Sequence, residues 1–336
     1  MRIKFALALI ACLMLFSLSF AQKQEGYGVY QYIVEEASGT LEDLSQAIEN
    51  SARENGWQVL ARIDAGVPEG CPYRARVLVL YHPDYARQIM EANRITGPFA
   101  VVDRINIFED ERGTHVSVVN PHSINRTILM DDQAYEEMTA AHLNALRSMV
   151  TSVVQGRVSS REYGQFRKKG YIGKTMGVMA GGKFADKLIV VKRVASDDWQ
   201  SVAASVKQGL EQKSKKWGMH LVYEVALPEY QTVIFGTTGT PMDSKSFAIV
   251  RAGGDKSRKD FKCPGLAHAA AYPIEVVVSG EEDGVAIRLV EEMFRMKMYF
   301  EDAGKWAFMK NMRMPGSIQK ELEQQIERGL TRLTAK

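Results

Sequence analysis

The chain has 336 residues, of which 46% are hydrophobic and 25% charged, and this balance is typical of a folded globular protein. It excludes an intrinsically disordered chain, and the length suits two domains of about 100–150 residues each. The formal net charge is +3, and Arg2 and Lys4 at the N-terminus carry two of these charges. The rest of the chain is nearly neutral, so we expect no nucleic-acid partner, because no global field attracts one.

Residues 1–21 have the layout of a cleaved secretory signal. Arg2 and Lys4 precede an uncharged run from Phe5 to Ala21, which ends with small residues at the first and third positions before the cleavage point. The run falls short of the ~20 apolar residues that span a bilayer. We therefore expect an exported protein, periplasmic or secreted, with no transmembrane segment after cleavage. Lipidation at Cys12 is an alternative that would leave an apolar mature N-terminus.

Residues 22–155 follow the order strand, helix, four strands, helix. Thr40 and Asp43 approximate a capping box before a helical apolar pattern, which Gly56 ends. Gly113 supplies the positive φ of a hairpin turn. The pattern predicts strands over 29–35, 57–63, 74–81, 101–108 and 114–119, a short helix over 83–92, and longer helices from Leu41 and over 135–153.

Residues 156–186 are rich in glycine and basic side chains, with only Glu162 and, at the end, Asp186 opposing the cations Arg157, Arg161, Arg167, Lys168, Lys169, Lys174 and Lys183. A solvated linker is the prediction, and contact with an acidic partner or lipid head groups is the alternative. Gly173-Lys174-Thr175 resembles a phosphate loop, but Lys168 stands where such a loop needs its first glycine. We therefore predict no nucleotide site here.

Residues 187–336 repeat the order of the first copy. The expected strands are 188–194, 219–225, 231–235 or 246–250, 273–278 and 285–290, and the expected helices are 196–217 and 317–333. Residues 41–63 match 203–223 at a constant offset, with Gly56 opposite Gly218. Residues 99–119 match 265–290, with Gly113 opposite Gly284 and Ile107 opposite Val278.

A recurring order of elements predicts two copies of one domain. The expected fold is α+β, with two tandem antiparallel sheets and the helices of each copy on one sheet face. The other faces would be buried by packing the copies together. Such an architecture places the expected ligand site in the groove between sheet and long helix, or at the seam between the copies.

The run from Ala75 to Pro121 resembles the bacterial and archaeal domain-of-unknown-function family 302. It has a strand ending at His82-Pro83, a variable helix, and a hairpin turned at a glycine. The second copy departs at residues 251–254, where His82-Pro83 has no counterpart, but keeps a proline-led strand at Pro273. The resemblance implies a TATA-binding-protein-like β-α-β4-α fold. It implies no activity and no catalytic residues.

Two cysteines, Cys71 and Cys263, follow the predicted signal, and they occupy non-equivalent places in the two copies. A disulfide joining the copies and a pair of free buried thiols are both open. The six histidines show no metal-ligand spacing, and His142 lies on an apolar helix stripe, where a hydrogen-bonded core histidine is expected. The sequence gives no nucleophile elbow or other candidate catalytic residue.

Methionine is the one residue type that points to a particular chemistry. Two stretches have the form Met-x-x-Met-x-Met, and they contain Met293, Met296, Met298, Met309, Met312 and Met314. Thioether sulfur suits Cu(I), so a copper site is a hypothesis, although flexible methionines that fill core gaps are the favoured explanation. Phe294, Trp306 and Phe308, which lie between them, fit a core or an interface equally well.

The function that these observations favour is a non-catalytic module that binds a small ligand or a protein partner, with no cofactor. An enzyme with dispersed catalytic residues is the alternative from another class. Copper binding through residues 293–314 is the second alternative.

Overall fold

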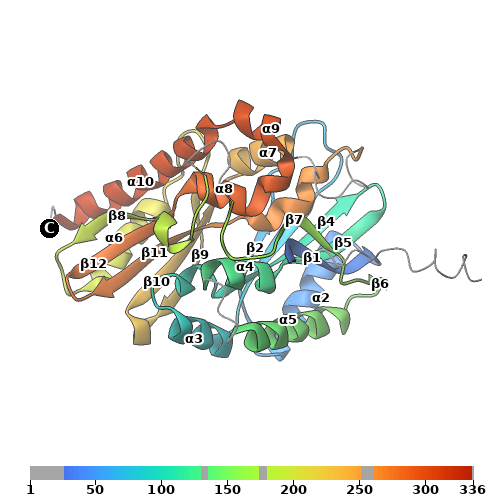
Figure 1. Cartoon of the computed structure of the whole chain (residues 1–336), viewed down its shortest axis with the longest axis horizontal. Helices are drawn as coiled ribbons and strands as arrows, with labels where there is room; N and C mark the ends of the chain where they lie inside the picture. Colours follow the sequence, from blue (N-terminus) through green and yellow to red (C-terminus); the bar gives the residue numbers. More distant parts are fainter. Residues whose placement is uncertain (1–25, 130–134, 174–179, 251–259, 335–336) are drawn as a thin grey trace, which may run out of the picture.

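The computed structural model describes residues 26–129, 135–173, 180–250 and 260–334, so the predicted signal at 1–21 lies outside it. Over the described residues the protein is α+β, with two antiparallel sheets covered by helices, as the sequence predicts (Figure 1). The elements of the first half are β1 (Tyr27–Ala37), α2 (Leu41–Glu54), β2 (Gln58–Asp64), β3 (Ala75–Tyr81), α3 (Pro83–Ala92), η1 (Gly97–Phe99), β4 (Val102–Asp110), β5 (Gly113–Val119), α4 (Pro121–Ile128) and α5 (Glu136–Thr151).

Two strands, β6 (Arg157–Val158) and β7 (Glu162–Arg167), join the halves. The second half contains η3 (Ala185–Lys187), β8 (Leu188–Val194), α6 (Trp199–Leu210), β9 (His220–Leu227), η4 (Pro228–Tyr230), β10 (Thr232–Thr238), α7 (Thr240–Ile249), η6 (Pro264–Ala271), β11 (Ile274–Glu281), β12 (Gly284–Val290), α8 (Glu292–Phe300), η7 (Glu301–Ala303), α9 (Lys305–Lys310) and α10 (Arg313–Thr334).

The strands of the two sheets follow the same order. The first sheet runs β2-β3-β4-β5-β1-β6, with β7 also pairing with β1, and the second runs β9-β10-β11-β12-β8. The hairpin glycines take the expected positions, because Gly113 begins β5 with φ 128° and Gly284 begins β12 with φ 119°. Both therefore use a backbone conformation that side chains with a Cβ rarely adopt.

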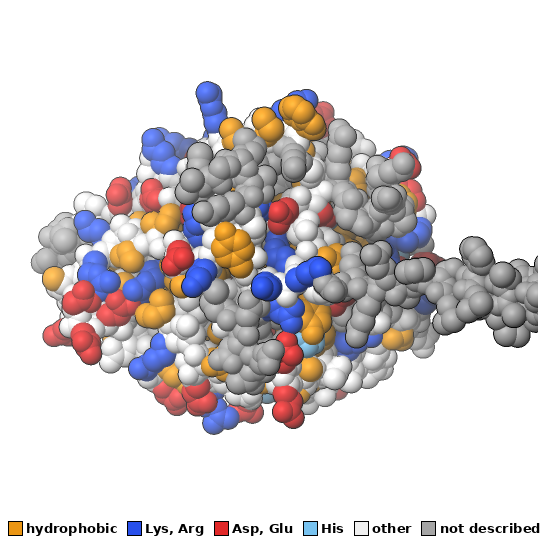
Figure 2. Space-filling view, in the orientation of Figure 1, with side chains coloured by type: hydrophobic (Ala, Val, Ile, Leu, Met, Phe, Trp, Pro, Cys, Tyr) orange, Lys and Arg blue, Asp and Glu red, His pale blue; other side chains and the backbone are white. Residues whose placement is uncertain are grey.

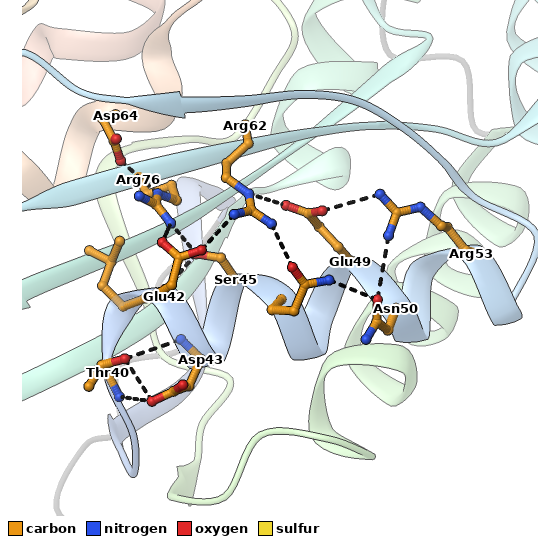
Figure 3. Close-up of polar contacts among 12 residues, drawn as sticks. Thr40, Glu42, Asp43, Ser45, Glu49, Asn50, Arg53, Arg62, Asp64 and Arg76 are labelled. Atoms are coloured by element: carbon orange, nitrogen blue, oxygen red, sulfur yellow. Dashed lines mark hydrogen bonds and ion pairs between the residues drawn. The ribbon is translucent and has the colours of Figure 1, made fainter.

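Helix α2 forms where its caps and apolar stripe predict it. The Thr40 side chain accepts a hydrogen bond from the Asp43 N–H, and the Asp43 carboxylate accepts one from the Thr40 N–H, which completes the capping box. Arg62 of β2 pairs with Glu42 and with the buried Glu49 of the helix, and Arg76 of β3 also pairs with Glu42 (Figure 3). These ion pairs align α2 with the two strands.

The two long helices of each half cover one sheet face, as predicted. In the first half, α2 and α5 bury Ile33, Leu78, Ile105 and Val118 of the sheet. In the second half, α6 and α10 pack closely against each other, and α6 also contacts β9, β10, β11 and β12. Figure 1 shows α10 along the outer edge of the second half.

The remaining sheet faces are buried between the halves, and each half contributes a segment to the other. Segment η6 of the second half packs on β3, β4 and β5, while η1 of the first half packs on β10 and β11. The edge strands β2 and β9 also lie against each other. Since η1 and η6 both precede the strand that starts the hairpin, the contacts are reciprocal, as in an isologous two-fold interface.

The prediction of a solvated linker is wrong for β7, which pairs with β1 and buries Tyr163 and Arg167, whereas residues 156–158 are exposed. Strands β6 and β7 extend the first sheet, and Tyr163 is buried with its hydroxyl donating to the Ala267 carbonyl at 2.7 Å. Arg157 and Arg161 pair with the buried carboxylate of Glu35. Basic side chains therefore serve as partners for a buried acid, which their spacing alone does not reveal. Lys174 and Thr175 lie outside the described residues.

The strand predicted over 231–235 or 246–250 is β10, so the first alternative is confirmed, and α7 covers most of 246–250. Two further expectations for the second half are wrong. The helix expected over 196–217 spans only Trp199–Leu210, because Asp198 caps its start and a loop follows Leu210. Gly218 has φ 66° and, like Gly56, lies two residues before the next strand, but α6 already ends at Leu210, so Gly218 is not the helix stop that Gly56 is.

Candidate functional site

A spacious hollow lies along α10. It is an open groove of about 330 Å³ between this helix and the loop that leads to β9. All of its lining residues have polar or charged side chains, and they are Ser214, Lys215, Glu321, Gln324, Glu327, Arg328 and Thr331. The positions on α10 recur every three or four residues, so they share one helix face. It lies between a helix and a loop, and so differs from both predicted places, the groove between sheet and long helix and the seam between the copies.

Glu321 fixes the wall of this groove. Its carboxylate accepts hydrogen bonds from the Ser214 hydroxyl at 2.5 Å and from the backbone N–H groups of Lys216 and Trp217 at 2.8 and 3.0 Å. Burial alone would raise the pKa of Glu321, but these donors outweigh it and lower the pKa. An ionised Glu321 thus holds the loop against α10 and leaves Lys215, Glu327 and Arg328 exposed around the hollow.

A second, much smaller pocket of about 20 Å³ lies between α4 and α5. Behind it, Asn125 donates to the Tyr85 hydroxyl at 2.9 Å and to the Thr139 hydroxyl at 2.8 Å. The Tyr85 ring stacks on His142 at 3.5 Å, and His142 Nε2 lies 2.9 Å from the Asp103 carboxylate. His142 is therefore the hydrogen-bonded core histidine that the helix pattern predicts.

The outer wall of this small pocket is aromatic and charged. His122 stacks on Tyr27 with the ring centroids 4.5 Å apart, and burial lowers the pKa of His122. Arg126 lies over the same tyrosine ring and pairs with Glu136 at 2.9 Å. An Asp–His pair can act as a general base where a substrate reaches it. Here the ring of Tyr85 covers His142, which is 8% exposed.

The seam between the halves contains a buried ionic cluster. Arg104 of β4 pairs with Glu275 of β11 at 3.2 Å, and Arg295 of α8 pairs with the same carboxylate at 3.4 Å. Both guanidinium groups also donate to the carbonyls of Ala271 and Pro273. Because these buried side chains come from both halves and pair with one another, the cluster joins the halves, and no pocket described in the structure opens onto it.

The two cysteines also meet at the seam. Cys71 and Cys263 form a disulfide with their Cα atoms 5.9 Å apart, and the bond joins positions 192 residues apart in the chain. Sequence spacing left this pairing open, because the two residues come from non-equivalent loops. The disulfide secures the loop after β2 to the segment that precedes η6.

The six methionines of the copper hypothesis are spread over different environments. Met298 and Met314 belong to the buried core, and Met293 is half-buried. Met296 and Met312 line a small apolar hollow together with Phe300 and Pro315. Met309 and Met312 are about 40% exposed.

The aromatic residues between the methionines divide in the same way. Phe294 is buried, whereas Trp306 is 75% exposed, and Phe308 is not described. The described His, Cys, Asp and Glu side chains form no group of three that could hold a metal ion. Copper binding by the methionines stays a hypothesis, which titration with Cu(I) under a competing chelator tests.

Comparison with known proteins adds a structural likeness. No protein-family model and no curated protein matches this sequence. The crystal structure of an uncharacterized conserved protein of family DUF302 from Bacillus stearothermophilus is similar over 37% of this chain and 98% of its own length. The sequence identity is 15% and the TM-score 0.32. Within the described residues, no helix is long and apolar enough to cross a bilayer.

Proposed function

We propose that this protein is an exported binding module built from two copies of one domain, and that it holds a small polar ligand in the groove along α10. The volume of the groove carries the proposal, because about 330 Å³ falls in the range of small-molecule sites. Export rests on the layout of residues 1–21. The duplication rests on the repeated sequence pattern and is supported by the shared strand order.

The charges around the groove indicate the class of ligand. Lys215 and Arg328 suit a carboxylate or another anion, and Glu327 suits an amine. All three side chains are exposed at the groove, while Glu321 is committed to the loop. A ligand with both charges, such as an amino acid or a short peptide, matches this arrangement.

A thermal-shift screen with amino acids and short peptides tests the proposal. A ligand at a hundredfold excess over its dissociation constant stabilises the protein by about 2.7 kcal/mol, which is readily measured. We expect the variants Lys215→Ala and Arg328→Ala to lose the shift. Lys192→Ala, which changes an exposed lysine on β8, should keep it. If a hit shifts all three variants equally, its site is not this groove.

A catalytic role is the second candidate, and the pair formed by Asp103 and His142 favours it. The small pocket beside the pair has room for about one water molecule, so a substrate would have to open the contact between α4 and α5. Without such an opening, the pair serves to hold α5 on β4. Binding in the α10 groove requires no comparable rearrangement.

A further inference from the structure

The segment around α9 presents large apolar side chains to solvent. Trp306 is 75% exposed, and Met309 and Met312 are 40% and 39% exposed. Figure 2 shows hydrophobic side chains gathered with Lys and Arg at the upper edge of the molecule, over the position of α9 in Figure 1. Exposed tryptophan next to exposed methionine is uncommon on a monomer surface and marks an interaction site. We call these three residues the α9 patch.

The charged residues of the segment that contains the α9 patch have one sign. Residues 303–320 contain Lys305, Lys310, Arg313 and Lys320 and have no acidic residue. Lys310 and Arg313 are exposed next to the apolar side chains. This local excess contrasts with the nearly neutral chain, so it is a feature of this surface. A partner that covers the α9 patch has to bury its apolar side chains and also present negative charge to the basic side chains beside them.

The apolar character continues inward from the surface. Met312 also lines the small hollow whose floor contains Met296 and Phe300, and Pro315 closes its side. The N-terminal end of α10 is anchored there, since Met314 and Ile318 are buried in the core. The α9 patch therefore stands on a packed base, which limits the conformational entropy lost on binding.

We propose that the α9 patch docks on the surface of an anionic lipid bilayer. A tryptophan ring is favoured at the level of the head groups, where its body is apolar and its N–H meets water. Lysine and arginine beside it attract acidic lipids, while the methionines enter the upper acyl region. Such docking is peripheral and reversible, and it is separate from the groove at the other end of α10.

Vesicle cosedimentation tests the docking. The full-length protein, purified after export, is mixed with vesicles of phosphatidylglycerol and phosphatidylethanolamine in equal parts, or with phosphatidylcholine alone. We expect binding to the anionic vesicles that weakens as salt is raised, and little binding to the neutral ones. Trp306→Ser/Met309→Ser and Lys310→Glu/Arg313→Glu should each bind at least about tenfold more weakly.

A matched variant and a second readout keep the test decisive. Val190→Ser changes an exposed apolar residue on β8 and should bind like the wild type. Vesicles should shift the tryptophan emission to shorter wavelength in the wild type and not in the variant that lacks Trp306. Docking through α9 is refuted if the wild type does not bind, or if both patch variants bind as well as it does. It is also refuted if sedimentation without vesicles shows that the patch joins two copies of this chain.

Discussion

Two carboxyl groups of the second half are buried without the pairing that keeps an acid ionised. Asp243 of α7 accepts hydrogen bonds from the Thr238 hydroxyl and the Gly66 N–H, and burial raises its pKa to about 7. Glu292 at the start of α8 is 1% exposed, faces Arg295 and Glu275, and burial raises its pKa to about 7 as well. Both groups therefore titrate near neutral pH.

We expect the protein to lose stability as the pH rises from about 4 to about 7, between the unfolded and folded pKa values of these two groups. A carboxyl whose pKa is raised on folding stabilises the fold below its unfolded pKa, and this contribution disappears as pH rises through the folded value. Each of Asp243 and Glu292 should lower the free energy of unfolding by up to about 1.4 kcal/mol per pH unit within its window. Urea unfolding at several pH values measures the slope.

The control for this prediction is the variant Asp243→Asn/Glu292→Gln, whose stability should change much less over the same range. Glu35 acts in the opposite direction. Burial would raise its pKa, but Arg161 outweighs burial and lowers the pKa to about 2, so its contribution is lost only below about pH 4.5. Equal stability of the wild type at pH 5 and pH 8 would contradict the assignment.

The apolar positions of the central strands support a second prediction. Ile107 of β4 and Val278 of β11 are fully buried at equivalent positions. Each lies three residues after a residue of the seam pair Arg104 and Glu275, so each faces the helix-covered side of its own sheet. Ile107→Asp and Val278→Asp should each cost at least about 4 kcal/mol, because each leaves an unpaired buried charge. Val190→Asp, at an exposed strand position, should cost little. A variant at Ile107 or Val278 that melts like the wild type would contradict the burial.

Sequence patterns predict which residue a side chain contacts only where the two residues are close in the chain. The capping pair Thr40 and Asp43 is three residues apart and is predicted, and so is the core position of His142. The partner of His142 is Asp103, 39 residues away, and no periodicity connects them. The same holds for Arg104 and Glu275, whose pairing depends on how the halves meet.

At the scale of elements, the crossing of α6 and α10 depends on two glycines. A Cβ on Gly209 would lie 2.1 Å from the Gln325 carbonyl oxygen, and one on Gly329 would lie 2.2 Å from the Ser205 carbonyl oxygen. The two helix backbones therefore touch where neither residue has a side chain. Glycine has a low helix propensity, so the close packing of the two helices is the reason for a glycine at both positions.

Alanine substitutions separate the effect of helix propensity from the effect of close helix packing. Gly209→Ala and Gly329→Ala should each destabilise the protein by about 1–3 kcal/mol, because the helices must move apart. Gly316→Ala in α10 meets nothing within 4 Å and should stabilise it by up to about 1 kcal/mol. Thermal unfolding of the three variants provides the measurement. If all three substitutions change stability in the same direction, the backbones of α6 and α10 do not touch at Gly209 and Gly329.

Most strands and the long helices are predictable from period and turn residues, and the short elements between the sheets are not. Helix α4 begins with Asn120 as its cap and Pro121 in its first turn, a start signal that the sequence analysis did not use. Strand β7 carries few apolar residues, so alternation is weak, and it is a strand because β1 offers it an edge. Tertiary pairing decides such segments. The residues that line the α10 groove could not be predicted from the sequence, because one wall of the groove is the loop that Glu321 holds against the helix.

At the scale of the whole molecule, the halves are joined by reciprocal packing and by covalent bonds. Segments η1 and η6 each cross to the sheet of the other half, and Arg104 pairs with Glu275 near the centre of the seam. These two residues are equivalent under the offset that aligns Gly113 with Gly284. In an isologous interface, equivalent residues meet only near the two-fold axis, so this pair marks the axis. The halves should therefore unfold together.

The disulfide between Cys71 and Cys263 gives the last prediction. It closes a loop of 192 residues, and the loss of loop entropy in the unfolded chain corresponds to about 5 kcal/mol at most. Cys71→Ser, Cys263→Ser and the double variant should all lose the same amount, because each removes the same bond. A reductant should lower the Tm of the wild type to that of the variants and leave theirs unchanged. Each form should still unfold in one transition, because η1 and η6 keep the halves coupled. Two separate transitions in the double variant would show that the disulfide, and not the reciprocal packing, joins the halves.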